Sequence, residues 1–309
     1  MLELPQPYDD VPPGRSASAP AEPGKLRGLR VKPMQARGIR LPRLQPGFTL
    51  AELAIVLVIV SLLLGGMLAM VSAQTEQRKW RDTQSQLEAA RDALLGYAIA
   101  NGRLPCPANS NSAGAEVPAG GGVCGAAGNN YDYYGGVVGG VTYGLLPAVT
   151  LGYLPVDTQG FALDAWGNRI RYAVSKVTTP AFSPNFTSTV MKTNGLSVLP
   201  YDLIVCASNT GTSVGPPPTC GATATNWVTG QKTVVAILYS PGKNGRDSIT
   251  LGADEAANED RTTGTGNDAV FISHTPAPSG ATGGEFDDQV LWLSVGTLYS
   301  KLVAAQVLP

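Results

Sequence analysis

The chain has 309 residues, a formal net charge of -1, 37 glycines and 24 prolines. This length is enough for one or two domains with a hydrophobic core, and the near-neutral balance gives no support for nucleic acid as a partner. The charge is unevenly placed, because residues 1–47 carry eight Lys or Arg against four acidic residues, whereas residues 48–309 carry 14 against 19.

Residues 1–47 are rich in Pro, Arg and Gly and show no apolar periodicity. Such a composition cannot bury enough apolar surface to offset the entropy lost on folding, so we expect this basic leader to be disordered. Met34 is an alternative start to Met1, and it would leave the shorter basic leader MQARGIRLPRLQPG.

Residues 48–75 are predominantly apolar, and Glu52 is their one charged residue. A helix of about 20 apolar residues crosses a hydrocarbon core of about 30 Å, so this run predicts a transmembrane segment. The excess of basic residues before the run predicts a cytoplasmic N-terminus, with the bulk of the chain on the other side of the membrane. A secretory signal peptide would have a shorter apolar core, and a plain membrane anchor would not explain Gly47-Phe48 or Glu52.

The segment GFTLAELAIVLVIVSLLLG, which begins at Gly47, resembles the N-terminus of type IV pilins and type II secretion pseudopilins. The family pattern is Gly, Phe and Thr-Leu-x-Glu, followed by about fifteen apolar residues, and every element of it is present. The resemblance implies that a prepilin peptidase cleaves between Gly47 and Phe48 and methylates the amine of Phe48. It also implies an inner-membrane assembly platform and other pilin or pseudopilin subunits as partners.

Glu52 has a physical role in this scheme. A carboxylate in a low-dielectric helix bundle needs a cationic partner, and the amine created at Phe48 of a neighbouring subunit supplies one. We therefore expect Glu52 to set the register of assembly, as a polar residue does in a coiled-coil core. The alternative is an interfacial Glu52 that reaches the lipid headgroups.

The helix is expected to continue through residues 76–101 as an amphipathic outer half. Apolar residues recur there at spacings of three, four and seven, which predicts one buried stripe: Trp80, Leu87, Ala90, Leu94, Tyr97 and Ala98. Gly102 supplies a stop, and Pro105 and Pro107 prevent continuation. The stripe needs a surface to pack on, and the simplest surface is a sheet formed by residues 102–309.

Residues 102–309 are predicted to form a β-rich head. Short apolar runs bounded by Gly, Pro, Asn or Asp indicate strands: NRIRYAVS, YDLIVCAS, KTVVAILYS, DAVFISH and QVLWLS. The last residues, VGTLYSKLVAAQVLP, predict a short helix, while GGVVGGVTYG and SPGKNGRD are expected to form turns. The predicted fold class is therefore α+β, with a long N-terminal helix on an antiparallel sheet, as in pilins.

The segment LDAWGNRIRYAV resembles a recurrent D-x-W-G-N segment of pseudopilins. Asp164 and Asn168 are suited to side chain to backbone turns, and Gly167 permits a positive φ. We expect Trp166 to pack on the long helix.

The four cysteines form two local pairs in the sequence, Cys106 with Cys124 and Cys206 with Cys220. Three connectivities are open, and the local one closes two Gly/Pro-rich loops in an oxidising compartment. A zinc site is disfavoured because no C-x-x-C is present. His274, the one histidine, is expected to be an ordinary edge residue.

The sequence favours a structural subunit over an enzyme. One histidine and the absence of G-x-S-x-G leave a Ser–His hydrolase without support. A mature chain of 262 residues from Phe48 onward is large for a major subunit, so we expect a minor subunit of a pilus or pseudopilus. The alternative is a tip or adhesive subunit whose head recognises a surface, DNA or a secreted substrate.

Residues 242–271 contain six acidic residues: Asp247, Asp254, Glu255, Glu259, Asp260 and Asp268. Oxygen ligands on a Gly-rich loop suit Ca²⁺, and major pseudopilins carry a Ca²⁺ site after a similar strand. Their spacing is not reproduced here, and a solvated acidic loop is the competing interpretation. Asp247 and Asp268 are the expected side-chain ligands because they flank the loop.

Overall fold

The computed structural model describes residues 47–125, 131–176, 186–215, 217–245, 251–259 and 269–308, without the side chains of 66–72 and 131–132. The chain divides into two units, residues 1–58 and 59–309. The described part of the first unit is the non-helical residues 47–49 and the beginning of α1 (Leu50–Asn101), and the rest of this helix belongs to the second unit.

The outer half of α1 packs on the head, as the apolar stripe predicted. Leu87, Ala90, Leu94 and Ala98 are all buried, while Trp80 and Tyr97 of the same stripe are partly buried. The helix ends at Asn101, and Gly102 follows with φ of +68°, a left-handed conformation that glycine adopts without strain. The predicted stop is therefore confirmed.

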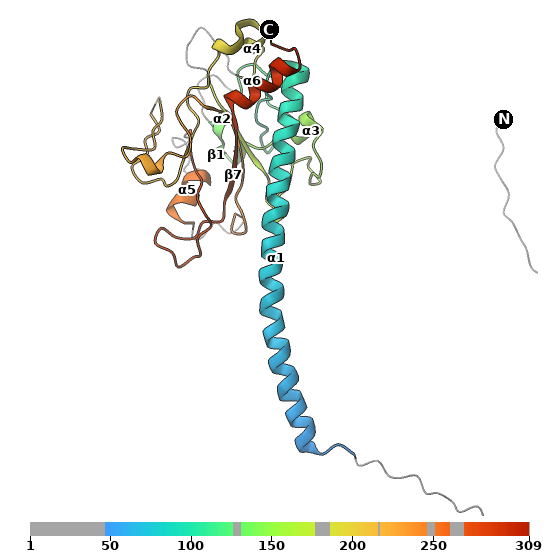
Figure 1. Cartoon of the computed structure of the whole chain (residues 1–309). Helices are drawn as coiled ribbons and strands as arrows, with labels where there is room; N and C mark the ends of the chain where they lie inside the picture. The colour runs from blue at the N-terminus through green and yellow to red at the C-terminus, as the bar shows by residue number, and fades with distance from the viewer. Residues whose placement is uncertain are drawn as a thin grey trace, which may run out of the picture. The chain divides into compact units, whose positions relative to one another are not determined.

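The main sheet has three antiparallel strands in the order β3 (Arg171–Val174), β5 (Val234–Ser240) and β7 (Gln289–Ser294). The helix α6 (Val295–Ala304) follows β7 directly, and Figure 1 shows both alongside the C-terminal part of α1. Their apolar side chains share one core with the helix stripe, and Leu298 and Leu302 of α6 are fully buried in it.

Two smaller sheets complete the strands of the described chain. One is the hairpin of β1 (Gly136–Val138) and β2 (Val141–Tyr143), and the other is the parallel pair of β4 (Ile204–Cys206) and β6 (Val270–Ile272). The remaining helical segments are short: α2 (Tyr131–Tyr134), α3 (Ala148–Leu151), α4 (Val190–Asn194), η2 (Gly195–Ser197), η3 (Ala224–Asn226) and α5 (Ala253–Glu259).

Two expectations need correction. The segment GGVVGGVTYG is a hairpin rather than only a turn, with Gly139 and Gly140 at positive φ between its strands. The strands β4 and β6 pair in parallel, so the head is not wholly antiparallel. Among the residues and side chains that the structure describes, no helix is apolar over a sufficient length to cross a membrane.

Candidate functional site

The first turn of α1 is closed by reciprocal hydrogen bonds between Thr49 and Glu52. Thr49 N and Thr49 Oγ1 donate to Glu52 Oε2 at 2.9 and 3.0 Å, and Glu52 N donates to Thr49 Oγ1 at 3.2 Å. Because Thr49 directly precedes the first helical residue, Leu50, the pair forms a capping box that satisfies orphan backbone donors. The T-x-x-E spacing is typical of a capping box and could have predicted these hydrogen bonds. The sequence analysis instead gave Glu52 a role in assembly alone.

One carboxylate oxygen of Glu52 is available to another partner. The two bonds from Thr49 both end on Oε2, and Oε1 makes no hydrogen bond within the part of the chain that the structure describes. The preceding Gly47 and Phe48 are exposed and outside the helix. The scissile bond predicted from the sequence therefore lies in accessible, non-helical backbone, with an exposed carboxylate a few residues away.

The beginning of α1 exposes a dense series of large apolar side chains. Phe48 is 85 % exposed and Leu50 is 88 % exposed, and the series continues to Leu64. The exposed members between them are Leu53, Ile55, Val56, Leu57, Val58, Ile59, Val60, Leu62 and Leu63. A continuous apolar surface of this kind marks a site that another protein or a membrane covers.

Hydrogen bonds from separate segments of the head hold the outer half of α1, and three of them reach it between Trp80 and Gln86. Ala165 N donates to Thr83 Oγ1 at 3.2 Å, Tyr153 Oη donates to the carbonyl of Gln86 at 3.2 Å, and Gln289 Nε2 donates to the carbonyl of Trp80 at 3.2 Å. Thr83 is fully buried although it is polar. Its hydroxyl places a polar contact beside the apolar stripe, and the spacing of the apolar residues did not predict this contact.

A buried ion pair lies directly after α1. Arg103 Nη1 and Nη2 donate to the two carboxylate oxygens of Glu116 at 2.8 and 2.7 Å, and Tyr97 Oη donates to the same carboxylate at 3.2 Å. The side chains of Arg103 and Glu116 are only 9 % and 5 % exposed. Burial by itself raises the pKa of Glu116, but the hydrogen bonds from Arg103 and from Cys106 N outweigh it and hold the pKa below its ordinary value.

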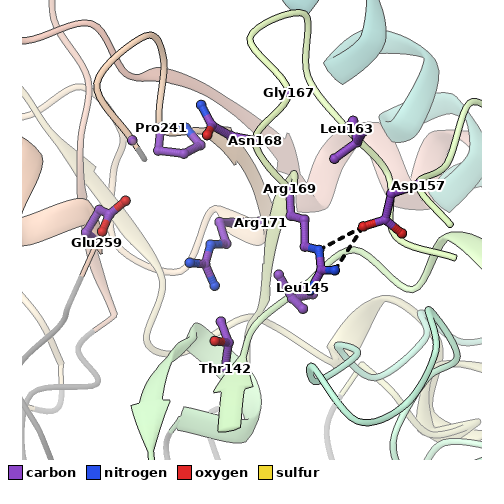
Figure 2. Close-up of a pocket in the computed structure, with 11 residues that line it drawn as sticks. Thr142, Leu145, Asp157, Leu163, Gly167, Asn168, Arg169, Arg171, Pro241 and Glu259 are labelled. Atoms are coloured by element: carbon purple, nitrogen blue, oxygen red, sulfur yellow. Dashed lines mark hydrogen bonds and ion pairs between the residues drawn. The ribbon is translucent and has the colours of Figure 1, made fainter. Parts of the chain in front are cut away.

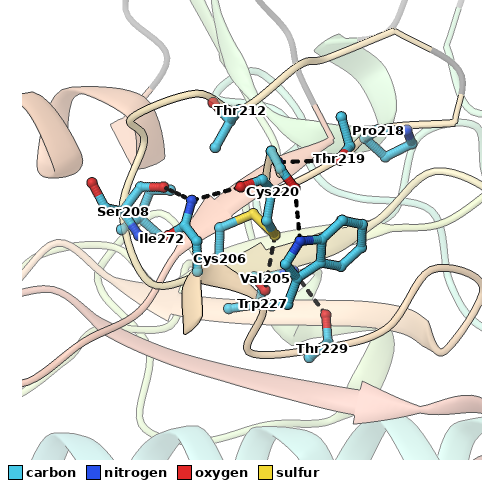
Figure 3. Close-up of a disulfide and its surroundings, with 12 residues drawn as sticks. Val205, Cys206, Ser208, Thr212, Pro218, Thr219, Cys220, Trp227, Thr229 and Ile272 are labelled. Carbon is cyan, nitrogen blue, oxygen red and sulfur yellow. Dashed lines mark hydrogen bonds between the residues drawn. A yellow bond between two sulfur atoms is a disulfide. The ribbon is translucent and has the colours of Figure 1, made fainter. Parts of the chain in front are cut away.

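Both local cysteine pairs are present as disulfides, Cys106–Cys124 and Cys206–Cys220, each with 5.5 Å between the Cα atoms. Figure 3 shows the second disulfide beside the indole of Trp227, whose Nε1 donates to the carbonyl of Gly221 at 2.9 Å. The second disulfide therefore ties the loop that contains Cys220 to the buried strand β4, whereas the first joins two non-helical, non-strand segments of the head.

Around Cys220, the amide of Asn226 fastens the loop that the disulfide closes. Its Nδ2 donates to the carbonyls of Cys220 at 2.7 Å and of Ser208 at 3.0 Å. Ser208 N in turn donates to Asn226 Oδ1 at 2.7 Å. One side chain thus links both ends of the loop by hydrogen bonds, in addition to the covalent link.

The D-x-W-G-N segment forms the turn that its residues predicted. Asp164 Oδ1 accepts hydrogen bonds from Trp166 N at 2.9 Å and Asn168 N at 2.7 Å, and Gly167 has φ of +88°. Asn168 Nδ2 also donates to the carbonyl of Gly242 at 2.5 Å. This turn therefore fixes the chain after β5 as well as its own backbone.

The predicted cation ligands Asp247 and Asp268 lie outside the described residues. The structure instead brings together three other carboxylates, Glu255, Asp287 and Asp288, whose ligand atoms all lie within 4.8 Å of one another. Asp287 Oδ1 is buried without a hydrogen-bond donor. Burial and the charge of Glu255 raise the pKa of Asp287 to about 7, so the cluster suits a hard cation that prefers oxygen ligands.

The sequence interpretation missed Asp287 and Asp288 because they follow the acidic loop by about twenty residues in the chain and only the fold brings them back to it. Of the residues that it did name, Asp254 is engaged elsewhere: it accepts a hydrogen bond from Asn209 N at 2.7 Å and lies 3.4 Å from His274 Nε2. His274 stacks on Phe286 with 3.8 Å between the ring centroids.

Comparison with protein families gives a match to the segment around the capping box. A model of the prokaryotic N-terminal methylation motif matches residues 42–68. This span includes Gly47, Phe48, Thr49 and Glu52. Neither the curated proteins nor the solved structures give a significant match to the chain.

Proposed function

We propose that this chain, which carries the N-terminal methylation motif of type IV pilin-like proteins, is a minor subunit of a type IV pilus or a type II secretion pseudopilus. One observation carries the proposal: the match at residues 42–68 falls on an accessible Gly47-Phe48 bond followed by the capped helix start at Thr49 and Glu52. The exposed apolar surface of α1 supports it, because such a surface needs partners to cover it.

The proposed maturation starts with hydrolysis of the Gly47–Phe48 peptide bond by a prepilin peptidase. Hydrolysis leaves a carboxylate on Gly47 and a free amine on Phe48. Transfer of a methyl group from a sulfonium donor, which departs as a neutral thioether while the amine releases one proton, gives a secondary amine that can still carry a positive charge. The exposed, non-helical backbone of Gly47 and Phe48 suits a bond that a peptidase must reach.

Assembly would then pair the amine of Phe48 in one copy with Glu52 in the next. Oε2 of Glu52 closes the capping box, and Oε1 remains for the neighbouring amine. A pair of opposite charges in an apolar surrounding is stable only when both partners are present, so a subunit out of register is penalised. The apolar side chains from Phe48 to Leu64 would pack against those of neighbouring copies.

The proposed location is the bacterial inner membrane before assembly, with the basic leader in the cytoplasm and the head in the periplasm. Two features of the chain support this orientation. The leader carries the excess of basic residues that cytoplasmic segments show, and both disulfides belong to the head, which suits an oxidising compartment.

The test is the intact mass of the mature protein isolated from cells with and without the peptidase. We expect a chain that begins at methylated Phe48 when the peptidase is present and the uncut precursor when it is absent. A Gly47→Val variant should remain uncut, whereas Gly96→Ala, in a part of α1 where an added methyl group meets no other atom, is a control outside the motif. A mature chain that begins elsewhere, or that retains residues 34–47, would overturn the proposal.

A tip or binding subunit is the second candidate function. The observation in its favour is a cavity on the head that is lined by charged side chains. Sheared filaments probed for this protein distinguish the two roles, because a minor subunit along the shaft is recovered with fragments of any length, whereas a tip subunit is recovered at one end of each filament.

A further inference from the structure

The strand β7 lies at one edge of the three-stranded sheet, because the strand order is β3, β5 and β7. On one side it pairs with β5 along its whole length. On the other side, within the part of the chain that the structure describes, no backbone group forms a hydrogen bond with the backbone of residues 289–293. This unpaired side is called the outer edge of β7.

The hydrogen bonds of β5 show which of its residues bond to β7. Ser175 N donates to the carbonyl of Val235 at 2.9 Å, so the backbone of Val235 faces β3. In an antiparallel sheet, successive residues of a central strand bond to alternate neighbours. Ala236 and Leu238 therefore bond to β7.

The backbone groups that point to the outer edge belong to Val290 and Trp292. Leu293 and Leu291 are the residues opposite Ala236 and Leu238, so they bond to β5. The N–H group that follows β7 donates to the residue before β5 at 2.8 Å, which agrees with this alternation. Val290 and Trp292 lie between the bonded residues, and their N–H and C=O groups turn away from β5.

A hollow of about 180 Å³ beside β7 makes the outer edge accessible. Both Val290 and Leu291 line it, although successive side chains of a strand point to opposite faces of the sheet. A space that borders both residues therefore extends past the edge of the strand. Trp80 and Gln84 of α1 also line the hollow, which has room for one side chain of an added segment.

The opposite edge of the sheet, along β3, is protected. Leu145 forms an antiparallel bridge with Arg171, and Tyr172 N donates to the carbonyl of Gly144 at 2.8 Å. Figure 2 shows Leu145 and Arg171 on this side, together with the second charged side chain of Arg169. Covering segments and charged side chains are two devices by which proteins prevent the pairing of sheet edges.

The outer edge of β7 has neither device. Its sequence, QVLWLS, contains no charged residue and no proline, and the register shift of this strand pair falls on β5. An exposed apolar edge of this kind pairs readily with an extended segment of another chain. Its six residues extend over about 20 Å, which is the length of an ordinary strand.

We propose that the outer edge of β7 binds an extended segment of a partner protein, which adds a fourth strand to the sheet. The N–H and C=O groups of Val290 and Trp292 hold the backbone of this segment. Its side chains are uncharged and largely β-branched or aromatic, because the strand that they lie beside is apolar and offers no charge. This role goes beyond assembly through α1.

The partner is a different protein rather than a second copy of this chain. Two copies that pair through the same edge of β7 are related by a two-fold axis, whereas copies in an open filament follow one another head to tail. The choice between these partners rests on the proposed function. Binding of an extended segment at the edge does not depend on it.

The test uses the full-length protein in detergent micelles and follows amide hydrogen exchange by NMR. In the free protein, the amides of Val290 and Trp292 should exchange at least about tenfold faster than those of Leu291 and Leu293. The probe is a blocked hexapeptide of alternating threonine and valine. Its binding should slow exchange at Val290 and Trp292 and leave the other two amides unchanged.

A matched peptide and three variants make the result specific. The peptide with proline at its two central positions lacks donors on both sides and should bind at least about tenfold more weakly. Val290→Pro removes an outward N–H group, and Val290→Lys adds a charge at the edge. Both should keep slow exchange in β5 and lose at least about tenfold in affinity. Val303→Lys, on the exposed side of α6, should bind as the wild type does.

The proposal fails if the amides of Val290 and Trp292 are already protected in the free protein, if the peptide protects neither, or if the proline peptide binds equally well. A dimer of the free protein that Val290→Pro abolishes, measured by sedimentation, would assign the edge to a second copy and contradict the choice of partner. These outcomes are independent of cleavage between Gly47 and Phe48, which the intact mass tests separately.

Discussion

At the scale of single residues, Glu52 has two roles, one in capping α1 and one in the proposed assembly. It accepts the hydrogen bonds of the capping box from Thr49, and it carries the negative charge that the proposed assembly needs. A glutamine at this position still supplies the capping acceptor but no charge. The two roles are therefore separable by substitution.

We expect Glu52→Gln to preserve the helix start and to reduce incorporation into filaments strongly, because the neighbouring amine loses its anion. The matched variant is Thr49→Ala, which keeps the charge and loses the cap at a cost of about 1 kcal/mol. The measurement is the amount of each variant in sheared filaments relative to its total amount in the cells. It shows whether incorporation depends on the charge of Glu52 or on the helix cap. Normal incorporation of Glu52→Gln would refute the role of Glu52 in register.

The buried pair of Arg103 and Glu116 predicts a dependence of stability on pH. The pKa of Glu116 in the folded chain is below its ordinary value of 4.5, so the pair stabilises the fold above that pH and the contribution is lost as the pH falls through the folded pKa. Glu116→Gln leaves Arg103 buried without a counter-charge and should cost about 3–5 kcal/mol at pH 7.

The measurement is denaturant unfolding of the full-length protein in micelles between pH 7 and pH 3. Below about pH 4.5 the wild type should lose stability more steeply than Glu116→Gln, so that the two curves converge. The control is Asp92→Asn, whose ion pair with Arg91 is exposed and contributes less than about 1 kcal/mol. If the unfolding free energies of wild type and Glu116→Gln fell in parallel with pH, Glu116 would not be the source of the pH dependence.

At the scale of secondary-structure elements, the sequence predicted which segments form strands and helices, because that depends on residues close together in the chain. It did not predict how the strands pair, because pairing depends on residues far apart in the chain. The five apolar runs became β3, β4, β5, β6 and β7, and the last segment became α6. The hairpin of β1 and β2 was not predicted because its segment contains many glycines, which favour turns, and only a few valines, which favour strands. The parallel pairing of β4 with β6 was missed because side-chain alternation carries no information on strand direction.

In the candidate site, too, local features were predictable from the sequence and features that the fold assembles were not. The T-x-x-E signature was local and could have identified the capping box, whereas the cluster of Glu255, Asp287 and Asp288 could not be predicted. Glu255 lies in α5, and the two aspartates precede β7. Their approach depends on how the chain between these elements returns to the sheet, and no spacing in the sequence encodes it.

This carboxylate cluster leads to a prediction about calcium. Without a cation, the ionisation of Asp287 opposes folding because its pKa is raised to about 7, so Asp287→Asn should stabilise the protein in EDTA at pH 8. With Ca²⁺ at 100 times its dissociation constant, the wild type should gain about 2.7 kcal/mol and Asp287→Asn much less.

Thermal unfolding of the full-length protein in micelles, with Ca²⁺ and with EDTA, is the measurement. Asp82→Asn removes an exposed carboxylate of α1 outside the cluster, and it should respond to Ca²⁺ as the wild type does. An unfolding midpoint of the wild type that does not move at millimolar Ca²⁺ would show that the three carboxylates do not form a calcium site.

At the scale of the whole second unit, β4 and β6 lie between two hydrophobic clusters. Alternate residues, such as Val205 and Phe271, belong to the main core with α1 and the three-stranded sheet. The others, such as Ile204 and Ile272, belong to a smaller cluster that includes both cysteines of the second disulfide. Burial on both faces explains why the runs that formed these strands are continuously apolar rather than alternating.

The smaller cluster should open before the main core when its disulfide is removed. A loop of about 15 residues gains roughly 3 kcal/mol from closure, so the double variant Cys206→Ala/Cys220→Ala should lose about that much locally. Hydrogen exchange should become faster at β4 and β6 and stay slow at β5 and β7. In the control Cys106→Ala/Cys124→Ala, faster exchange should be confined to the loop around residues 103–125. Equal acceleration everywhere would show a single cooperative core.

The attachment of α1 to the head has a mechanical consequence. The bonds from Ala165, Tyr153 and Gln289 reach the helix between Trp80 and Gln86, a length of about 9 Å along its axis. A pulling force along that axis stretches all three together, in shear, instead of breaking them one after another as in peeling. Because they share the load with the buried stripe of Leu87, Ala90 and Leu94, a subunit dragged by its helix would carry its head along without unfolding it.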